Sequence, residues 1–304
     1  MLCLDLAPNQ RIIDLKATLN SGHEMPVITL GTYQITGRPQ ILETLDAAFK
    51  AGYRSIDTAA VYRNEQEIGY ALRQLLPKHG LKREDIFITT KLAPSDHGDE
   101  LRVTQAVTTS LQYLGISYID LYLIHWPGAA GYSPSDPCNY TFRTNTWKHL
   151  IKLYNEGKGI IRSIGVSNFT VGHLSQLLRD TSIIPAVNQV EFHPHFQQSK
   201  ELTNIAKKNG IILQAYSPLG GTANPCLLKD PIVSHVAHSN KITPGQTLLR
   251  YALQRGYAVV PKSVTPSRIE ENSRLEKELS QEDINTLNNI GRRDKYAWNP
   301  EPVM

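Results

Sequence analysis

The chain has 304 residues, of which 40% are hydrophobic and 20% are charged. Its 32 Lys and Arg against 28 Asp and Glu leave a formal net charge of +4, with both signs mixed along the chain. This balance argues against a nucleic-acid or membrane-surface partner, and the length allows one large α/β domain or two smaller ones. The three cysteines show no CxxC spacing, which argues against a disulfide framework or a thiolate zinc site.

No targeting or membrane segment is expected. Residues 1–5 (MLCLD) lack the basic start and the apolar run of a signal peptide. No apolar run in the chain approaches the length that crosses a bilayer. We therefore expect a cytoplasmic protein.

The first element in chain order is an expected β-hairpin over residues 13–28. Residues 14–19 alternate between apolar and polar, 20–22 (NSG) provide a turn, and 25–28 return. From residue 27 onward, short strands alternate with helical patterns, and each strand is a continuous apolar run, as expected for a strand buried on both faces. The expected strand and helix pairs are 27–30 with 40–51, 54–56 with 65–76, 86–89 with 99–113, 119–124 with 145–156, 161–166 with 171–179, 186–190 with 199–208, 211–215 with 244–254, and 258–260 with 266–272, followed by a helix near 281–290.

This alternation predicts a parallel sheet. Eight strand–helix units fit an α/β fold of the closed (β/α)8 TIM-barrel type, as a single domain over residues 1–304 with an N-terminal hairpin and extra helices. A doubly wound open sheet is the alternative, but no G-x-G-x-x-G follows the first strand. The segment from Pro127 to Asn145 is rich in Gly, Pro, Ser and Asn, and it is expected to be a long loop at the mouth of the barrel.

Ionisable residues stand at the carboxyl ends of three consecutive strands. Asp57 ends the second strand and Tyr62 follows on its loop, Lys91 ends the third strand, and His125 ends the fourth. Because the carboxyl ends of barrel strands share one mouth, we expect these four side chains to converge. Any one of them alone fits a structural role, whereas four in one mouth indicate a site of chemistry.

Their chemistry favours proton donation by Tyr62. A free tyrosine has a pKa of about 10, and a neighbouring Lys91 cation is expected to lower it. Asp57 can pair with Lys91 and hold it in place. A neutral His125 can hydrogen-bond a carbonyl oxygen and orient it without adding a charge.

Three segments resemble the signatures of the aldo-keto reductase family. The first is 52–69 (GYRSIDTAAVYRNEQEIG), the second is 111–127, which ends in LIHWP, and the third is 260–263 (VPKS) with Arg268, Glu271 and Asn272. The similarity runs from about residue 16 to 300. It implies a monomeric NADPH-dependent oxidoreductase that reduces aldehydes or ketones, with Asp57, Tyr62, Lys91 and His125 as the catalytic residues.

The resemblance also implies a nicotinamide site at the other strand ends. Ser167, Asn168 and Gln189 match residues that bind the carboxamide, and Tyr216 matches a ring that stacks on nicotinamide. Positively charged side chains and hydrogen-bond donors that could bind the additional phosphate of NADPH follow the eighth strand. The full set of expected cofactor contacts is Thr32, Asp57, Ser167, Asn168, Gln189, Tyr216, Ser217, Leu219, Lys262, Ser263, Thr265, Arg268, Glu271 and Asn272.

The expected substrate contacts are His125, Tyr33 and Trp126, with Phe169 a weaker candidate. His193 and His195 have no third ligand at useful spacing, so no metal site is expected. The tail beyond residue 298 is short compared with family members that take bulky substrates, and it predicts a more open pocket.

Two alternatives stay open at this point. Some members of the family are lens structural proteins or channel subunits without catalysis, although the intact set of catalytic residues argues against that class here. Within the enzymes, a prostaglandin F synthase-like or ketosteroid reductase activity is the other reading.

Overall fold

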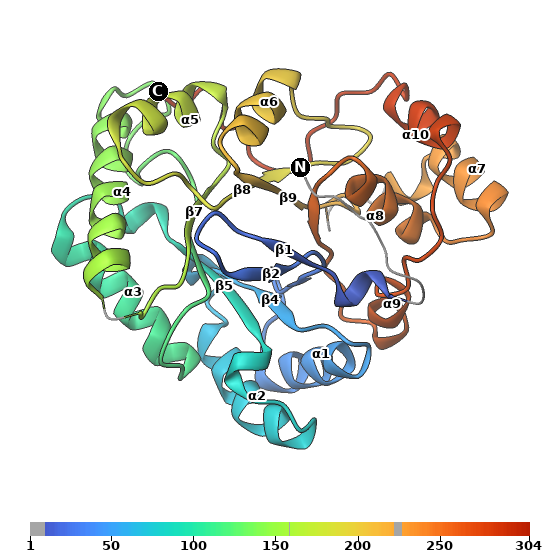
Figure 1. Cartoon of the computed structure of the whole chain (residues 1–304), viewed down its shortest axis with the longest axis horizontal. Coiled ribbons are helices and arrows are strands. Elements are labelled where there is room, and N and C mark those ends of the chain that lie inside the picture. Colours follow the sequence, from blue (N-terminus) through green and yellow to red (C-terminus); the bar gives the residue numbers. More distant parts are fainter. Residues whose placement is uncertain (1–9, 158, 222–226) are drawn as a thin grey trace.

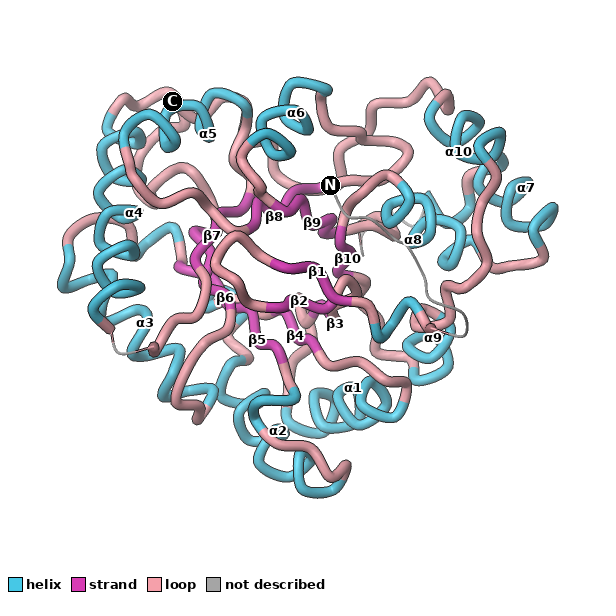
Figure 2. Tube along the Cα trace, viewed as in Figure 1, coloured by secondary structure: helices cyan, strands magenta, loops and turns pink. Residues whose placement is uncertain are grey.

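A computed structural model of the chain describes residues 10–157, 159–221 and 227–304. The expectation that residues 1–5 are no signal peptide concerns residues outside these ranges. The hairpin is confirmed with shorter strands: β1 (Lys16–Thr18) pairs antiparallel with β2 (Glu24–Pro26). It lies across the centre of the strand ring in Figures 1 and 2. The side chain of Asn20 in its turn donates to the backbone carbonyl of Pro185 at 3.1 Å.

Eight parallel strands form the barrel, as predicted. In chain order they are β3 (Leu30–Gly31), β4 (Ser55–Asp57), β5 (Phe87–Leu92), β6 (Leu121–Ile124), β7 (Ile164–Ser167), β8 (Val187–Glu191), β9 (Ile212–Tyr216) and β10 (Ala258–Val260), and each pairs with the next. Backbone bonds close the ring between the first and last strands, from Thr29 N to Val259 O (2.9 Å) and from Val259 N to Val27 O (2.8 Å). Nearly every strand residue is buried, which explains the continuous apolar runs in the sequence.

Helices form an outer layer around the strands (Figure 1). They are α1 (Arg38–Lys50), α2 (Glu65–Lys78), α3 (Glu100–Leu114), α4 (Cys138–Glu156), α5 (Val171–Asp180), α6 (Lys200–Lys208), α7 (Pro231–Asn240), α8 (Pro244–Gln254), α9 (Pro266–Glu271) and α10 (Gln281–Asn288). Side chains of Asp99, Thr170, Ser199 and Ser280 cap the first turns of α3, α5, α6 and α10. No helix among the described residues has the length and apolar character to cross a membrane.

One expectation about the fourth unit is wrong. The segment 127–145 is not a loop throughout, because α4 begins at Cys138. The Pro- and Gly-rich part ends at Pro137, where the Asp136 carboxylate accepts from Cys138 N (2.8 Å). The buried Asn139 then ties the loop to the helix, accepting from Ala129 N (3.0 Å) and donating to Ser133 O (2.8 Å). Asn and Thr in this first part of α4 have weak helix propensity, which hid the helix from the sequence pattern.

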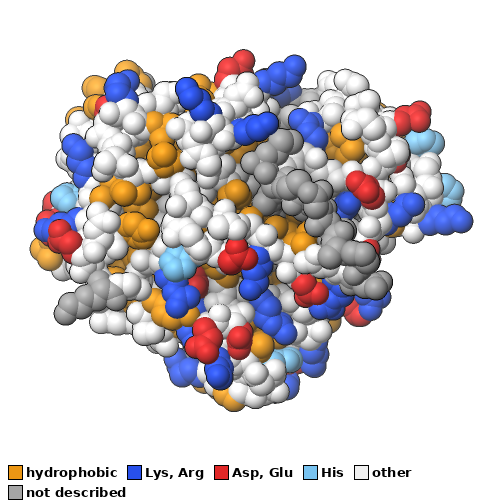
Figure 3. Space-filling model, in the orientation of Figure 1, with side chains coloured by type: hydrophobic (Ala, Val, Ile, Leu, Met, Phe, Trp, Pro, Cys, Tyr) orange, Lys and Arg blue, Asp and Glu red, His pale blue; other side chains and the backbone are white. Residues whose placement is uncertain are grey.

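Gly69 of the first signature segment has a packing role. A Cβ at this position of α2 would lie 2.4 Å from the backbone oxygen of Tyr113 at the end of α3. Only glycine therefore lets the two helices approach this closely. On the face shown in Figure 3, acidic and basic side chains are interspersed, as the mixed charge pattern predicts.

Candidate active site

The centre of the site is a buried ion pair between the ends of β4 and β5. Lys91 Nζ lies 2.5 Å from Asp57 Oδ1 and also donates to the Thr58 carbonyl at 2.9 Å. The Lys91 side chain is completely buried, and burial lowers its pKa although the Asp57 charge acts in the opposite direction. A buried charge of this kind is tolerated only when it is paired and hydrogen-bonded. The predicted contact between these two residues is confirmed.

Tyr62 lies on a short 3-10 turn, Ala60–Tyr62, that follows β4. Its hydroxyl is 3.5 Å from Lys91 Nζ, and its ring lies 5.1 Å from Tyr33 and 5.6 Å from His125, centroid to centroid. Burial, and then the charge of Asp57, raise the pKa of Tyr62 well above its usual value. The expectation that Lys91 lowers this pKa is therefore wrong for the structure. The reason is that burial disfavours the phenolate and that the Asp57 carboxylate, 2.5 Å from the lysine, adds negative charge nearby, so Tyr62 is a neutral phenol.

His125 directly follows β6, and its ring packs against Tyr62. Burial, together with the positive charge of Lys91, lowers the pKa of His125 to about 3. The expected neutral imidazole is thus confirmed. Its Nδ1 atom is buried and has no hydrogen-bond partner among the described residues.

A hydrogen-bonded amide cluster adjoins these residues. Tyr216 donates its hydroxyl proton to Asn168 Oδ1 at 2.7 Å, and Asn168 Nδ2 donates to the His125 carbonyl and to Ser167 Oγ, each at 3.0 Å. Asn168 has φ +64°, a left-handed conformation that asparagine tolerates better than most residues. Ser167 Oγ in turn donates to the backbone carbonyl of Gln189 at 2.9 Å. The cluster therefore joins the ends of β7, β8 and β9.

The side chain of Gln189 makes a contact that the sequence reasoning missed. Its Nε2 atom donates to Asp57 Oδ2 (2.7 Å) and to Gln214 Oε1 (2.8 Å) inside the barrel. Gln189 and Gln214 are register partners on β8 and β9. Two glutamines at buried positions of neighbouring strands were the available signal. Gln189 therefore supports the ion pair from the opposite side of the mouth.

The residues expected at the phosphate end lie after β10. Lys262 is half-buried, which lowers its pKa, and Arg268 is exposed on α9. Neither cation has an ion-pair partner among the carboxylates of the described residues. Ser263 Oγ accepts from Thr265 N at 3.1 Å. Two unpaired cations beside hydroxyl and backbone donors fit an anionic group.

Other expected cofactor contacts are engaged within the protein. The Thr32 hydroxyl is buried and donates to the Asp57 carbonyl at 2.8 Å. Glu271 accepts from the Thr243 hydroxyl at 2.7 Å, and Asn272 is buried. Ser217 has φ +48° in the loop after β9, which continues through Leu219 to the last residue described before the gap at 222–226.

Aromatic side chains surround the mouth. Tyr33 is half-exposed. Trp126 packs at a right angle against Trp298 with ring centroids 6.1 Å apart, and Trp298 is 73% exposed. Phe169, the weaker substrate candidate, is buried instead and packs edge-on against His173. Trp298 was not predicted as a site residue because its place depends on a distant segment.

His193 and His195 are held by hydrogen bonds. His193 Nε2 lies 3.1 Å from Glu191 Oε1, and His195 lies between Asp230 Oδ2 (2.9 Å) and the Tyr296 hydroxyl (2.7 Å). Within the described ranges, no group of three or more His, Cys, Asp or Glu side chains is arranged to hold a metal ion.

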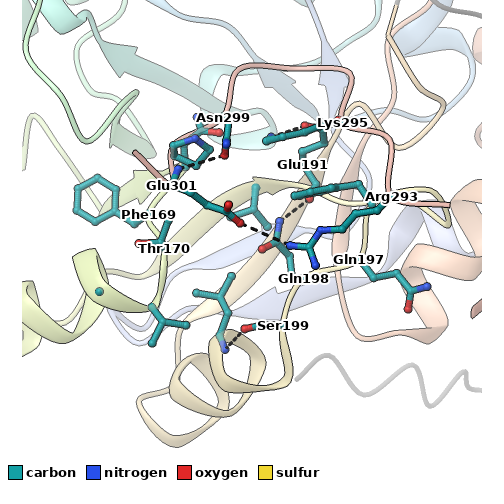
Figure 4. Close-up of a pocket in the computed structure, with 17 residues that line it drawn as sticks. Phe169, Thr170, Glu191, Gln197, Gln198, Ser199, Arg293, Lys295, Asn299 and Glu301 are labelled. Atoms are coloured by element: carbon teal, nitrogen blue, oxygen red, sulfur yellow. Dashed lines mark hydrogen bonds and ion pairs between the residues drawn. The ribbon is translucent and has the colours of Figure 1, made fainter. Parts of the chain in front are cut away.

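A cavity of about 300 Å³ lies beside the mouth (Figure 4). It is formed by residues 168–172 after β7, by residues 190–202 around the start of α6, and by residues 293–301. Its lining includes Asn168 of the amide cluster but none of Asp57, Tyr62, Lys91 and His125.

The comparisons with known proteins agree with this geometry. A sequence model described as "Aldo/keto reductase family" matches residues 27–292. The chain is 41% identical over 287 residues to the glyoxal reductase of Bacillus subtilis (strain 168), covering 94% of this chain and 96% of that protein. It is 40% identical over 295 residues to the glycerol 2-dehydrogenase (NADP(+)) of Saccharomyces cerevisiae, covering 90% of each chain. The solved structure of the aldose reductase from Schistosoma japonicum matches with a TM-score of 0.82 and 38% identity, over 93% of this chain and 94% of that one.

Proposed function

The chain belongs to the aldo/keto reductase family, and from this premise we propose that it reduces small aldehydes and ketones to alcohols with NADPH. The observation that carries the proposal is the convergence of four side chains from three strand ends. Tyr62 lies between the Lys91–Asp57 pair and the neutral ring of His125. We propose Tyr62 as the general acid, and residues 1–304 as one monomeric domain.

In this mechanism His125 orients the carbonyl. Because its imidazole is neutral, it can donate a hydrogen bond to the carbonyl oxygen without competing for the proton. The chemistry that a bound NADPH supplies is donation of a hydride to the carbonyl carbon. Tyr62 gives its proton to the oxygen as negative charge develops there, and the product is an alcohol.

The raised pKa of Tyr62 and its role as an acid are compatible. The phenol is fully protonated at neutral pH, so the proton is always in place. The phenolate forms next to the ammonium group of Lys91, 3.5 Å away, which stabilises it only once the proton has left. Asp57 and Gln189 fix that ammonium group from two sides.

The proposed preference for NADPH over NADH rests on Lys262 and Arg268, which have no ion-pair partner among the described residues. An arginine binds a phosphate with two parallel hydrogen bonds, which supports Arg268, with Lys262, as the group that recognises the ribose phosphate of NADPH. Ser167, Asn168 and Tyr216 would hold the nicotinamide end. The yeast relative is named as NADP(+)-dependent, which agrees with this assignment.

The names of three of the relatives favour small polar substrates. Glyoxal reductase, glycerol 2-dehydrogenase and D/L-glyceraldehyde reductase all handle compounds of two or three carbons. We therefore propose short aldehydes and dicarbonyls as the substrate class.

The test is NADPH consumption with a panel of carbonyl compounds, from glyoxal and glyceraldehyde to benzaldehyde and a ketosteroid. We expect turnover with the short aldehydes, and loss of turnover in Tyr62→Phe with NADPH binding retained. Binding of NADPH without consumption in any member of the panel would favour the non-catalytic alternative.

A further inference from the structure

The segment that follows α10 is held against the barrel by a buried carboxylate. Glu191 ends β8, and its side chain is fully buried. Its Oε2 atom accepts from Lys295 Nζ (2.5 Å) and from Ala297 N (3.3 Å). Its Oε1 atom accepts from Tyr296 N (2.5 Å) and from His193 Nε2 (3.1 Å). Three of the four donors therefore come from residues 295–297.

Ring contacts strengthen this attachment. The Tyr296 ring stacks on His193 with centroids 4.9 Å apart, and its hydroxyl bonds His195. Lys295 Nζ lies 4.7 Å above the Phe196 ring, an arrangement that attracts a cation. Figure 4 shows Lys295 directed at Glu191, with Arg293 directed at Glu301 nearby.

A second attachment lies eight residues further along. His173 Nε2 donates to the Val303 carbonyl at 2.7 Å, and Met304 N donates to the Pro134 carbonyl at 2.9 Å. The buried guanidinium of Arg143 donates to the Met304 carbonyl. The segment between the two attachments, 298–302, places Trp298 against Trp126.

A buried carboxylate is a costly way to fix a segment unless its charge is compensated. Here Lys295 supplies the compensating charge. Detachment of residues 295–297 from the barrel would therefore leave the Glu191 carboxylate without its counterion. The register of β8 and β9 sets Glu191 opposite Tyr216, and Trp126 directly follows His125 in the chain. The Glu191 attachment is therefore connected to both ends of the candidate active site.

We propose that Glu191 is a positioning residue for substrate selection, an inference that rests on the proposed reductase function. It fixes residues 295–297, and through them it keeps the Trp298 ring against Trp126. The two rings then form one wall of the substrate entrance next to His125 and Tyr62. Aromatic aldehydes contact this wall, whereas glyceraldehyde is too small to depend on it.

The test compares Glu191→Gln with Trp298→Ala, alone and combined. Glu191→Gln keeps the shape of the side chain and removes its charge. We expect the amides of Tyr296 and Ala297 to exchange with deuterium roughly tenfold faster or more, because charge-assisted hydrogen bonds are lost. We expect the KM for benzaldehyde to rise roughly two- to tenfold, the scale of one aromatic contact, with kcat and the KM for glyceraldehyde nearly unchanged.

The combined variant distinguishes positioning from a separate effect. If Glu191 acts through Trp298, the double variant has the benzaldehyde KM of Trp298→Ala alone. A KM that multiplies the two single effects would overturn the proposal, and so would unchanged exchange at residues 296 and 297. The matched control is Glu301→Gln, which removes an exposed carboxylate from the same segment and should leave exchange at 296 and 297 as in wild type.

One further variant and the wild-type protein keep the result decisive. If Glu191→Gln does not fold, Lys295→Met removes the same ion pair from the segment side and is expected to give the same exchange and KM changes. A wild-type protein that binds NADPH but reduces no aldehyde would overturn the proposed function and the selection role with it. The exchange experiment would then still report separately whether Glu191 holds residues 295–297.

Discussion

Three buried histidines make the fold sensitive to mild acid. Burial lowers the pKa of His97 to about 4, of His125 to about 3 and of His173 to about 4. In the unfolded chain each would titrate near about 6.5. The unfolded state therefore binds more protons as the pH falls through 6.5, and stability decreases until the pH reaches the folded-state pKa values.

The size of the effect follows from these values. Each group contributes about 1.4 kcal/mol for every pH unit below 6.5, which is about 2 kcal/mol at pH 5 and about 6 kcal/mol for the three. A domain is typically stable by roughly 5–15 kcal/mol, so the protein should approach its unfolding threshold near pH 5. Glu65 acts in the opposite direction, because burial raises its pKa, whereas His193, whose pKa burial lowers, adds to the loss.

The surroundings of His97 explain why it stays neutral. Its Nε2 atom lies 2.9 Å from the Trp126 carbonyl, and its Nδ1 atom lies 3.0 Å from the Thr146 hydroxyl oxygen. Because Nε2 must donate to the carbonyl, Nδ1 of the neutral ring is an acceptor and receives the Thr146 hydroxyl proton, while the hydroxyl oxygen accepts from Gly98 N at 3.1 Å. A proton on Nδ1 would displace this bond, and the positive charge of Arg143 lies nearby.

The assay is urea unfolding at pH 7.5 and at pH 5.0, and the quantity compared is the change in unfolding free energy between them. His97→Gln removes one titrating group, and the change should shrink by about 2 kcal/mol relative to wild type. The control is His235→Gln, an exposed position on α7 that should leave the change as in wild type. A wild-type stability that is equal at the two pH values, or a His97→Gln variant with the full wild-type change, would refute the reasoning.

Further outcomes concern the reaction site. Tyr62→Phe should lower turnover by about 10²–10⁴-fold, the usual contribution of a general acid, with NADPH affinity retained in a fluorescence titration. Lys91→Met should abolish most turnover and also cost about 3–5 kcal/mol of unfolding free energy, because it leaves Asp57 unpaired; equal stability in urea would contradict the buried ion pair. Arg268→Ala should weaken NADPH binding roughly 10- to 150-fold and leave NADH binding nearly unchanged, so equal losses for both would remove Arg268 from phosphate recognition. Shortening the loop at 127–137 should change the order of preferred aldehydes without weakening NADPH binding, and weakened binding with an unchanged order would place the loop elsewhere.

The barrel was predictable because each of its strands is recognisable from its own short stretch of sequence. Strands buried on both faces must be continuously apolar, and the run 258–260 was predicted with its observed bounds. The start of α4 was not predictable in the same way. Its first turns contain the buried Asn139 and Arg143, which bond to the preceding loop and to the tail rather than forming a helical apolar stripe.

The membership of the site was predictable from strand ends, but its electrostatics were not. A strand end places Asp57, Lys91 and His125 in one mouth whatever the details of packing. The direction of the Tyr62 pKa shift depends instead on the burial of the phenol and on the Asp57 charge beside it. Neither that burial nor the distance of 2.5 Å between Lys91 and Asp57 is specified by any spacing in the sequence. The bonds from Glu191 to residues 295 and 296 were not predictable for a related reason, because these partners lie more than 100 residues away along the chain.

Asp57 links the two halves of the mouth through its two carboxylate oxygens. Oδ1 receives Lys91 from β5, and Oδ2 receives Gln189 from β8, which continues to Gln214 on β9. A polar chain thus crosses the apolar interior from the ion pair beside Tyr62 to the strands that carry the amide cluster. Because every member is hydrogen-bonded, a shift of one end must break a buried bond or move the other end. One hydrogen-bonded chain therefore links the proposed proton donor and the proposed nicotinamide contacts, whereas residues 295–304 are held by Glu191 and Arg143.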